Sequence, residues 1–458
     1  MCYNVKKESG DNMIIKTFYA SEYAKLDSDV RLGGGTDDTA AIQSILDLAK
    51  EYGGIHLIMD GAALISRLKL YSNTTIECMN KDCGFYQIDN TDNSMLTNYN
   101  WDNYEIKTRN ITLIGGTYNQ NCIHQAHDSS YDENICAADR INDHNGVFNL
   151  CIEFYGVEHL NVRDITIRDF RTFAFTVGCF KNVMIENVWF ELEHHMNGNQ
   201  DGFHFWGPGQ YLTVKNCGGK VSDDIMNIGP DERDKKSSIT DVLVDGLFLD
   251  DAEQAVRLLS RGTGRLDRVT IRNVTGQYRS YGFYIDPWFD DNSVGNFGNI
   301  FIENVDLKEH KHTYEYHPPV LFSIAGNIEC LTLKNIRHHN AYDNRTLVEI
   351  GLPFYSTHPW NYKEYEMPVK QNIDTIIIDG LTVTEKEGEP EDTNYITIYD
   401  EVENFILRNV FVVKKQNSNG NLIWFDQKGK INNLIASEIH TDGLKKIVSD
   451  ESKIKTKF

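Results

Sequence analysis

Long apolar runs are missing from this sequence. No stretch of about 18 consecutive apolar residues occurs, so the chain offers no candidate for a transmembrane helix. Residues 1–12 are polar and lack the apolar core of a secretory signal. Met13 is an alternative start, which makes 1–12 an N-terminal extension. We therefore expect a cytoplasmic protein with no membrane partner.

Basic residues are scarce relative to acidic ones. The 458 residues include 45 Lys and Arg against 67 Asp and Glu, which gives a formal net charge of −22. Because phosphate contacts need clustered basic side chains, this balance argues against a nucleic-acid partner. Proline is also scarce, with 9 residues, and 40% of the chain is hydrophobic. This is the composition of a folded globular protein and not of a disordered one.

Cysteine is present but follows no recognisable spacing. The nine cysteines are odd in number and scattered, which does not suit a disulfide framework. Cys78 and Cys83 are too isolated to form a metal-binding motif. We expect free thiols, most of them buried beside apolar residues, in a reducing compartment. No metal and no cofactor is expected.

One short pattern recurs along most of the chain: alternating apolar residues, then Asn or Asp, then apolar residues again. Alternation with a period of two predicts β-strands. The first seven of these polar positions follow one another at intervals of 23 to 31 residues. The polar positions are Asp164, Asn187, Asn216, Asp245, Asn273, Asn304, Asn335, Asp379 and Asn409.

Repeats of this length, with short strands and a polar residue at a fixed place, predict stacked coils. Asn tolerates the left-handed backbone conformation of a sharp corner and can hydrogen-bond along a ladder. The expected fold is all-β: a single-stranded right-handed parallel β-helix, forming one domain over 13–458. A β-propeller is the alternative, but its repeats are longer and its blades antiparallel.

A solenoid needs its open end covered, and a helix precedes the repeats. A cap-type Thr or Asp is followed by helical spacing of apolar residues, so a capping helix is expected near 39–51. Three polar, aromatic insertions are expected near 118–146, 286–298 and 353–372. Long loops on a rigid scaffold frame binding faces, and the aromatics of the last insertion suit either sugar stacking or packing on a coil. Those aromatics are Phe354, Tyr355, Trp360, Tyr362 and Tyr365.

Several blocks of the chain resemble a known group of β-helix proteins. The segment from Gly34 to Gln43, followed by Gly53 to Leu57, resembles the opening of the pectin-lyase-like superfamily. Segments 199–204, 222–228 and 255–258 resemble signature blocks of the polygalacturonase-type glycoside hydrolases of family 28. The resemblance implies hydrolysis of a glycosidic bond in a pectic or related galactoside or uronide, with inversion. An oligosaccharide or polysaccharide is then the expected partner, and a homo-oligomer stays open.

Three aspartates carry the chemistry that the resemblance implies. Glycoside cleavage needs one acid to protonate the leaving oxygen and one carboxylate to activate water or attack directly. Adjacent coils of a β-helix lie about 4.8 Å apart, so carboxylates one coil apart come within a glycosidase span, and their repulsion raises at least one pKa. The resemblance makes Asp223 the acid, while Asp201 and Asp224 hold the water. Alternatively, all three are turn carboxylates, like the pairs at 37–38, 250–251 and 290–291.

Alternation along the neighbouring strands adds candidates for substrate binding. If the apolar residues of segments 203–205, 226–228, 256–258 and 283–285 point inward, the residues between them point outward. Stacked in register, they are expected to form one exposed polar column beside the carboxylates, with Asp286 just beyond it. Its members are His204, Asn227, Arg257 and Tyr284. Arg257 is expected to hold a sugar hydroxyl or a uronate, or else to pair with an aspartate.

The chain departs from the family pattern in two blocks. The Gly-His-Gly block has no match between Asp224 and Arg257, and the candidate substitutes are His204 or the pair at 194–195. Leu259 stands where the family has Lys, which makes a neutral, mixed or short modified oligosaccharide as good a substrate as homogalacturonan. An alternative alignment of segment 225–229 moves the double-aspartate role to Gln200 and Asp201.

Two other functions stay open on the same fold. A polysaccharide lyase needs an Arg or Lys base near carboxylate-bound Ca²⁺, and Arg257, Arg261 or Arg265 are candidates. A non-catalytic carbohydrate-binding or adhesive solenoid, like a tailspike, needs neither group.

Overall fold

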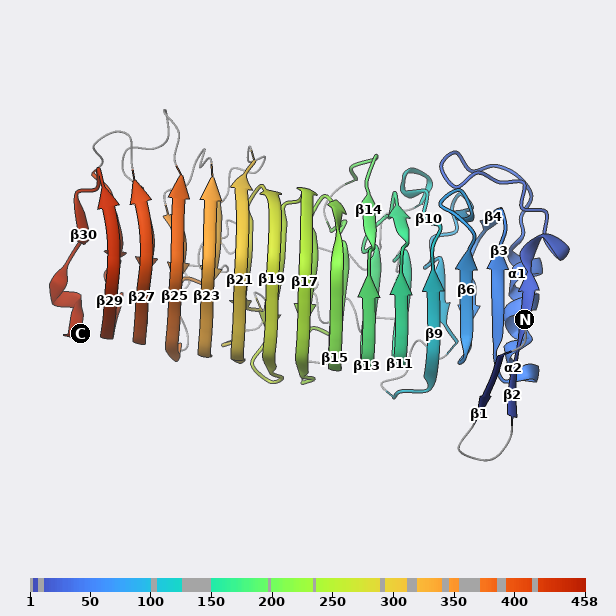
Figure 1. The fold of residues 1–458 in the computed structure, drawn as a ribbon, viewed down its shortest axis with the longest axis horizontal. Helices are drawn as coiled ribbons and strands as arrows, with labels where there is room; N and C mark the ends of the chain where they lie inside the picture. Colours follow the sequence, from blue (N-terminus) through green and yellow to red (C-terminus); the bar gives the residue numbers. More distant parts are fainter. Residues whose placement is uncertain are drawn as a thin grey trace. The chain divides into compact units, whose positions relative to one another are not determined.

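Stacked parallel strands make up most of the protein, as Figure 1 shows for a computed structural model. The structure describes residues 3–6, 12–99, 105–125, 150–196, 199–233, 236–288, 293–310, 319–339, 346–353, 371–384, 393–413 and 419–458. Internal contacts divide the chain into two compact units, Met1–Asp223 and Asp224–Phe458. The predicted right-handed parallel β-helix is confirmed.

The first unit contains two helices and the first coils. Helices α1 (Thr39–Asp47) and α2 (Ala49–Tyr52) confirm the predicted capping helix, and α2 ends at Gly53, whose φ of 77° no other residue type adopts as readily. Strand β1 (Tyr3–Lys6) pairs antiparallel with β2. The remaining strands pair in parallel along three faces. The first face contains β2 (Asn12–Tyr19), β3 (Ile55–Met59), β6 (Thr74–Cys78), β9 (Thr108–Ile114), β11 (Ile152–Arg163), β13 (Phe175–Glu186) and β15 (Phe203–Lys220). The second contains β4 (Ala62–Ile65), β7 (Gly84–Gln87), β10 (Thr117–Asn119), β12 (Thr166–Arg168) and β14 (Trp189–Glu191), and the third contains β5 (Leu68–Leu70) and β8 (Leu96–Asn98).

The second unit stacks its strands along two faces, again in parallel. Each long strand is bent by a corner into two short segments. The long strands are β17 (Ile239–Asp251), β19 (Leu266–Tyr278), β21 (Phe297–Glu309), β23 (Ile328–His339), β25 (Ile373–Thr384), β27 (Glu401–Val413) and β29 (Lys430–Asp442), followed by β31 (Ile454–Lys457). The short ones are β16 (Asp224–Gly229), β18 (Gln254–Ser260), β20 (Tyr281–Pro287), β22 (Val320–Ile324), β24 (Thr346–Ile350), β26 (Asn394–Ile398), β28 (Asn421–Phe425) and β30 (Lys446–Val448).

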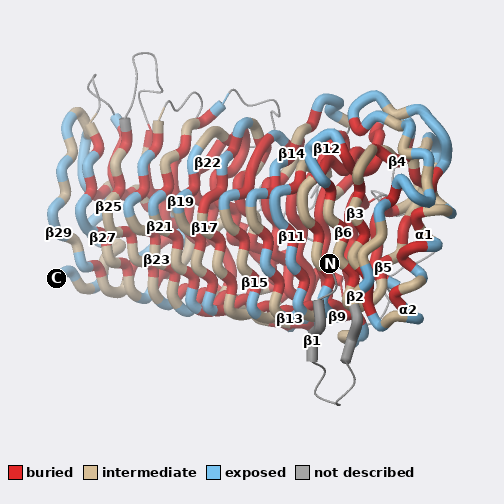
Figure 2. Tube along the Cα trace, turned by 45° about the vertical axis from the view of Figure 1, so that its right-hand side comes forward, coloured by how far each residue is buried: buried red, intermediate tan, exposed pale blue. Residues whose placement is uncertain are grey.

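The core of each unit is a set of apolar columns that run from coil to coil, and Figure 2 shows the buried positions along successive strands. One column of the second unit aligns seven side chains in register, none of them more than 3% exposed. Because each coil covers the apolar face of the next, no coil buries its core alone. This column contains Val242, Val269, Ile300, Leu331, Ile376, Phe405 and Leu434.

The recurrent Asn residues occupy the corners, as their repeat predicts. Asn273, Asn304 and Asn335 have φ values of 60°, 56° and 52°, in the left-handed region. Their amides form a ladder, in which Asn304 Nδ2 donates to Asn273 Oδ1 and Asn335 Nδ2 donates to Asn304 Oδ1, both at 3.1 Å. Asp245 starts this ladder as an acceptor, 2.6 Å from Asn273 Nδ2. In the Asp-Gly copies, Gly246 takes the left-handed conformation instead, with a φ of 91°.

Other sequence predictions have mixed outcomes in the structure. The cysteines of the described residues are free, and all but Cys330 are buried, as expected. Most of the predicted insertions, including Phe354, Tyr355, Trp360, Tyr362 and Tyr365, lie outside the described residues. Where the structure describes the chain, no helix has the length and apolarity to span a bilayer.

The corner ladder makes a stability prediction. Asn304→Ala removes two amide hydrogen bonds, each contributing about 1 kcal/mol, and forces alanine into the left-handed region at about 1–2 kcal/mol. We expect the free energy of unfolding to fall by about 2–4 kcal/mol in chemical denaturation, as the sum of these effects. Thr270→Ala, on the outer side of a neighbouring strand, is the control. Equal stability of the two variants would contradict a structural role for the ladder.

Candidate active site

Asp201 and His204 form a buried pair in the first unit. Asp201 lies just before β15, and His204 is the second residue of that strand. The Asp201 Oδ2 and His204 Nδ1 atoms are 3.0 Å apart, and both side chains are 3% exposed. At this distance the two groups share a hydrogen bond, which fixes the orientation of the imidazole ring.

Asp223 lies beside Asp201, as expected for residues one coil apart. A carboxylate oxygen of Asp223 is within 4.8 Å of one of Asp201. The backbone N–H of Asn199 donates to Asp223 Oδ2 at 3.0 Å, and the N–H of Asp223 donates to the carbonyl of Gln200 at 3.3 Å. Asn199 has a φ of 54°, so the chain turns sharply just before Asp201. Two oxygens this close can both hydrogen-bond one water molecule, because each such bond spans about 2.8 Å.

The exposure of these groups differs from the expectation of a solvent-facing site. Taken as whole residues, Asp201 and His204 are each 2% exposed, while Asp223 has intermediate exposure. The ring of Phe173 stacks on His204 with centroids 4.0 Å apart and planes 16° from parallel, and Trp206 meets the imidazole edge-on at 5.2 Å. Phe203 and Phe205 are buried in the core, as the alternation predicts. The His204 side chain between them is covered by aromatic neighbours. Of the expected polar column, His204 is therefore buried and not exposed.

Asp224 opens β16 in the second unit, directly after Asp223 in the chain. Its side chain is fully buried, and its Oδ2 accepts a hydrogen bond from Arg257 Nη1 at 3.2 Å. Of the two roles predicted for Arg257, the structure contains the pairing with an aspartate. A guanidinium at this distance favours the ionised form of the carboxylate.

The polar column of the second unit is aligned as predicted, and all of its members are buried except Arg257, which has intermediate exposure. Asn227, Arg257 and Tyr284 are register partners on successive strands, and the guanidinium of Arg257 lies 5.5 Å from the ring centre of Tyr284. Asn227 and Tyr284 are 2% and 1% exposed, and Asp286 is 0% exposed, so the predicted exposed column is wrong in its exposure. The tyrosine ring at 281 packs 4.9 Å from Tyr284, and burial raises the pKa of Tyr284 well above its usual value, with Asp286 adding to the rise.

The candidate histidines and Leu259 mark the two blocks in which the chain departs from the family pattern. Of the candidate histidines, His204 contacts Asp201, while His194 Nδ1 lies 3.3 Å from a different carboxylate, that of Asp169. Leu259 is fully buried, so it offers no polar group to a uronate.

The arginines proposed for a lyase base are engaged in other contacts. Arg265 donates to Glu329 at 2.6 Å, and this bond raises the pKa of Arg265 above its usual value, which opposes a role as base. The guanidinium of Arg261 stacks over Trp288 at 4.5 Å.

Sequence reasoning missed one neighbour of this site, Phe173, and singled out Gln200 only through the alternative alignment. Phe173 precedes β13 and stacks on His204 from the preceding coil. Gln200 fixes the loop before Asp201, donating from Nε2 to the carbonyl of Phe170 at 2.7 Å and accepting from the N–H of Met196 at 2.7 Å. The contacts of Phe173 with His204 and of Gln200 with Phe170 join residues about one coil apart, so only the register between coils reveals them.

Comparison with known proteins supports the fold. No protein-family model and no curated protein sequence matches the chain. The tailspike protein of E. coli bacteriophage HK620, solved in complex with a pentasaccharide, is similar over 97% of this chain and 82% of its own, with a TM-score of 0.56 and 9% identity. Gene product 12 of bacteriophage phi29 is similar over 95% of this chain and 57% of its own, with a TM-score of 0.56 and 12% identity. A family 28 exopolygalacturonase of Yersinia enterocolitica reaches a TM-score of 0.47 at 11% identity, over 100% of this chain and 82% of its own.

The two similarities with TM-scores of 0.56 establish the β-helix fold. The solved structures similar to this chain include polygalacturonases and other β-helix proteins that act on or bind carbohydrate. At identities of 9% to 12%, the activity of this chain has to be argued from its own residues.

The buried pair of Asp224 and Arg257 makes a second prediction. Arg257→Met leaves the carboxylate of Asp224 buried without this guanidinium, so the free energy of unfolding should fall by about 3–5 kcal/mol. Adding Asp224→Asn should recover part of the loss in a double-mutant cycle measured by chemical denaturation. Arg272→Met, which breaks the exposed pair with Asp245, is the control and should have a far smaller effect. Additive effects of the first two substitutions would contradict the coupling.

Proposed function

We propose that the chain is a glycoside hydrolase that cleaves a pectic or related galactoside or uronide oligosaccharide by acid–base catalysis. The observation that carries the proposal is the approach of Asp223 to Asp201 within 4.8 Å, with His204 bonded to Asp201 at 3.0 Å. Two carboxyl groups in this relation are the minimum equipment for glycoside cleavage. The β-helix fold agrees with this activity but does not select it.

The exposure of the carboxyl groups supports a division of roles. Asp223 is the partly exposed member of the set, so it can meet the glycosidic oxygen and act as the general acid. Asp201 is nearly inaccessible and its Oδ2 is bonded to His204, which suits a carboxylate that holds a water molecule. Asp224 is buried and paired with Arg257, and the water-holding role that the resemblance implies for it stays a prediction.

The separation and the exposure of the carboxyl groups favour different stereochemical outcomes, and we base the proposal on exposure. Carboxyl groups about 5–5.5 Å apart are typical of retaining enzymes, in which one of them attacks the sugar directly. Asp201 is 2% exposed, which disfavours its direct attack on a sugar carbon. A water molecule held by Asp201 and activated there reaches the sugar more readily, and this route inverts the anomeric centre. We therefore propose inversion.

The substrate is proposed as neutral or only partly charged near the cleaved bond. Arg257 is engaged by Asp224, and Leu259 has no charge to offer a uronate. The Asn227 Oδ1 atom is buried and accepts no hydrogen bond from the residues that the structure describes. Because this atom is buried, it does not reach a substrate, and the proposal on substrate charge rests on Arg257 and Leu259.

The burial of Asp201 and Asp224 favours a second candidate, a non-catalytic carbohydrate-binding solenoid. In this function the aspartates are structural turn residues. The HK620 tailspike, solved with a pentasaccharide, has a similar fold, so carbohydrate binding is the property common to both proposals.

Replacement of the paired aspartates tests catalysis. Asp223→Asn and Asp201→Asn should each lower turnover of a cleaved oligosaccharide by about 10²–10⁴-fold, because each removes a proton-transfer or water-holding group. Turnover is measured by mass spectrometry on a panel of pectic oligosaccharides and neutral galactosides, and circular dichroism checks folding.

Asp250→Asn, at the exposed member of the aspartate doublet at 250–251, is the matched control and should keep full turnover. Full activity of Asp223→Asn would remove that residue from the mechanism. Binding without cleavage across the panel would favour the non-catalytic solenoid, and an unsaturated product with new ultraviolet absorbance would identify a lyase.

The anomeric outcome tests the role of Asp201. Proton NMR during the first turnovers on a cleaved substrate should show a product of opposite anomeric configuration, because water and not Asp201 attacks the sugar. Retention of configuration would contradict the assignment and make Asp201 a nucleophile.

A further inference from the structure

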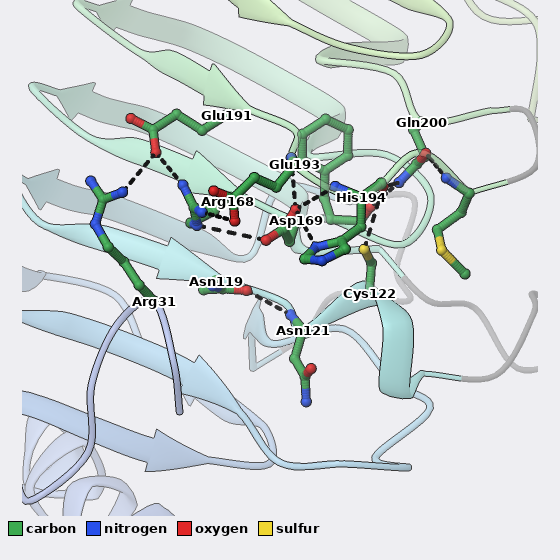
Figure 3. A network of polar contacts seen from close by, with 12 residues as sticks. Arg31, Asn119, Asn121, Cys122, Arg168, Asp169, Glu191, Glu193, His194 and Gln200 are labelled. Carbon is green, nitrogen blue, oxygen red and sulfur yellow. Dashed lines mark hydrogen bonds and ion pairs between the residues drawn. The ribbon is translucent and has the colours of Figure 1, made fainter. Parts of the chain in front are cut away.

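A second cluster of chemically reactive side chains lies in the first unit, at the corner that follows strands β10, β12 and β14. The last residues of these strands, Asn119, Arg168 and Glu191, are register partners on three successive coils. The chain segments that leave the three strands therefore run side by side. They carry Cys122, Asp169 and His194, which Figure 3 shows together.

Backbone hydrogen bonds hold this corner in place. The N–H of Cys122 donates to the carbonyl of Asp169 at 2.9 Å, and the N–H of Asp169 donates to the carbonyl of Glu191 at 3.0 Å. Asp169 Oδ1 accepts from the N–H groups of Glu193 at 2.9 Å and His194 at 3.1 Å. The three segments are thus tied to one another at the positions from which the side chains project.

The side chains present three different donor atoms to one point. A thiol sulfur, a carboxylate oxygen and an imidazole nitrogen all lie within 4.8 Å of one another. His194 Nδ1 is 3.3 Å from Asp169 Oδ1, and Cys122 Sγ lies 3.7 Å from the carbonyl oxygen of His194. Cys122 and Asp169 are 0% and 4% exposed, while the His194 side chain is 46% exposed, so the cluster is closed on one side and open on the other.

Two arginines lie near the cluster: Arg171, whose positive charge acts on the Cys122 thiol, and Arg168, beside Asp169. Arg168 Nε lies 3.6 Å from Asp169 Oδ2, but the same guanidinium is bonded to Glu191 at 2.6 Å and to Glu193. Burial, with Asp169 next in effect, raises the pKa of the Cys122 thiol to about 12. A metal ion bound here therefore has to displace the thiol proton, as it does at other cysteine ligands.

We propose that Cys122, Asp169 and His194 form a binding site for a borderline divalent metal ion, with Zn²⁺ as the best match. One sulfur, one nitrogen and one carboxylate oxygen suit Zn²⁺, whereas Ca²⁺ and Mg²⁺ require oxygen ligands. Ligands at about 2.0–2.3 Å around tetrahedral zinc lie about 3.3–3.8 Å apart, so the cluster closes around the ion with a contraction of about 1 Å. The fourth position faces the open side of the cluster and takes water.

A metal ion here also anchors the segment that leads to Asp201. His194 begins this segment, and Gln200, which precedes Asp201, donates from Nε2 to the carbonyls of Phe170 at 2.7 Å and His194 at 3.4 Å. Binding at the cluster is independent of the proposed hydrolysis, and only this anchoring role rests on it.

Cobalt substitution tests the site without any activity measurement. The full chain, stripped with a chelator, is titrated with Co²⁺ and followed by absorbance, and Zn²⁺ binding is measured by calorimetry. We expect one saturable site per chain, a thiolate-to-cobalt charge-transfer band, and visible bands of tetrahedral intensity that Zn²⁺ displaces. Cys122→Ser should abolish the charge-transfer band.

Two further variants keep the test decisive. Cys330→Ser removes the one partly exposed thiol among the described cysteines and should leave the band unchanged. His194→Ala, at a half-exposed position that folding tolerates, should weaken Zn²⁺ binding at least tenfold even if Cys122→Ser fails to fold. Absence of saturable binding, a band that persists in Cys122→Ser or disappears in Cys330→Ser, or unchanged affinity in His194→Ala would overturn the proposal.

Discussion

Each coil of this protein can bury its apolar face only against the next coil. Parallel pairing holds equivalent residues of successive coils about 4.8 Å apart, and every other feature depends on that spacing. Inside, it aligns columns such as the one through Ile300 and Leu331, which remove apolar surface from water. At the corners it brings the amides of Asn273, Asn304 and Asn335 within hydrogen-bonding distance of one another.

The same spacing creates the chemistry of the chain. Residues at equivalent positions of adjacent coils lie side by side although a whole coil separates them in sequence. Asp201 and Asp223 come within 4.8 Å of each other in this way. It also brings Cys122, Asp169 and His194 together from three coils. Two adjacent carboxyl groups, one of them partly exposed, are what the proposed proton transfer requires, and a thiol, a carboxylate and an imidazole are what the proposed metal site requires.

Much of the fold could be predicted from the sequence because its determinants are local. Strand alternation, the spacing of Asn187, Asn304 and their equivalents, and the helix before the repeats are visible in short windows, and each has a direct physical meaning. The inward direction of Phe203 and Phe205 followed from alternation alone. The exposure of His204 could not be predicted in the same way, because Phe173 of the preceding coil covers it. No pattern within one strand reveals that contact.

The site was predictable only in part, for a related reason. A resemblance of short blocks singled out Asp201, Asp223 and Asp224, but their burial depends on packing between coils. The cluster of Cys122 and His194 has no sequence motif, because its members come from separate coils and meet only when the register of β10, β12 and β14 is known. Register between coils is the information that the sequence carries least clearly.

The most direct test of the central claim, that Asp223 is the acid beside a water-holding Asp201, is a crystal structure of Asp223→Asn with a bound, uncleaved oligosaccharide. The account predicts that the glycosidic oxygen lies within hydrogen-bonding distance, about 2.7–3.2 Å, of the substituted side chain at position 223, with an ordered water molecule against Asp201. An oligosaccharide bound on another face of the coils, with Asp201 and position 223 away from any sugar, would contradict it.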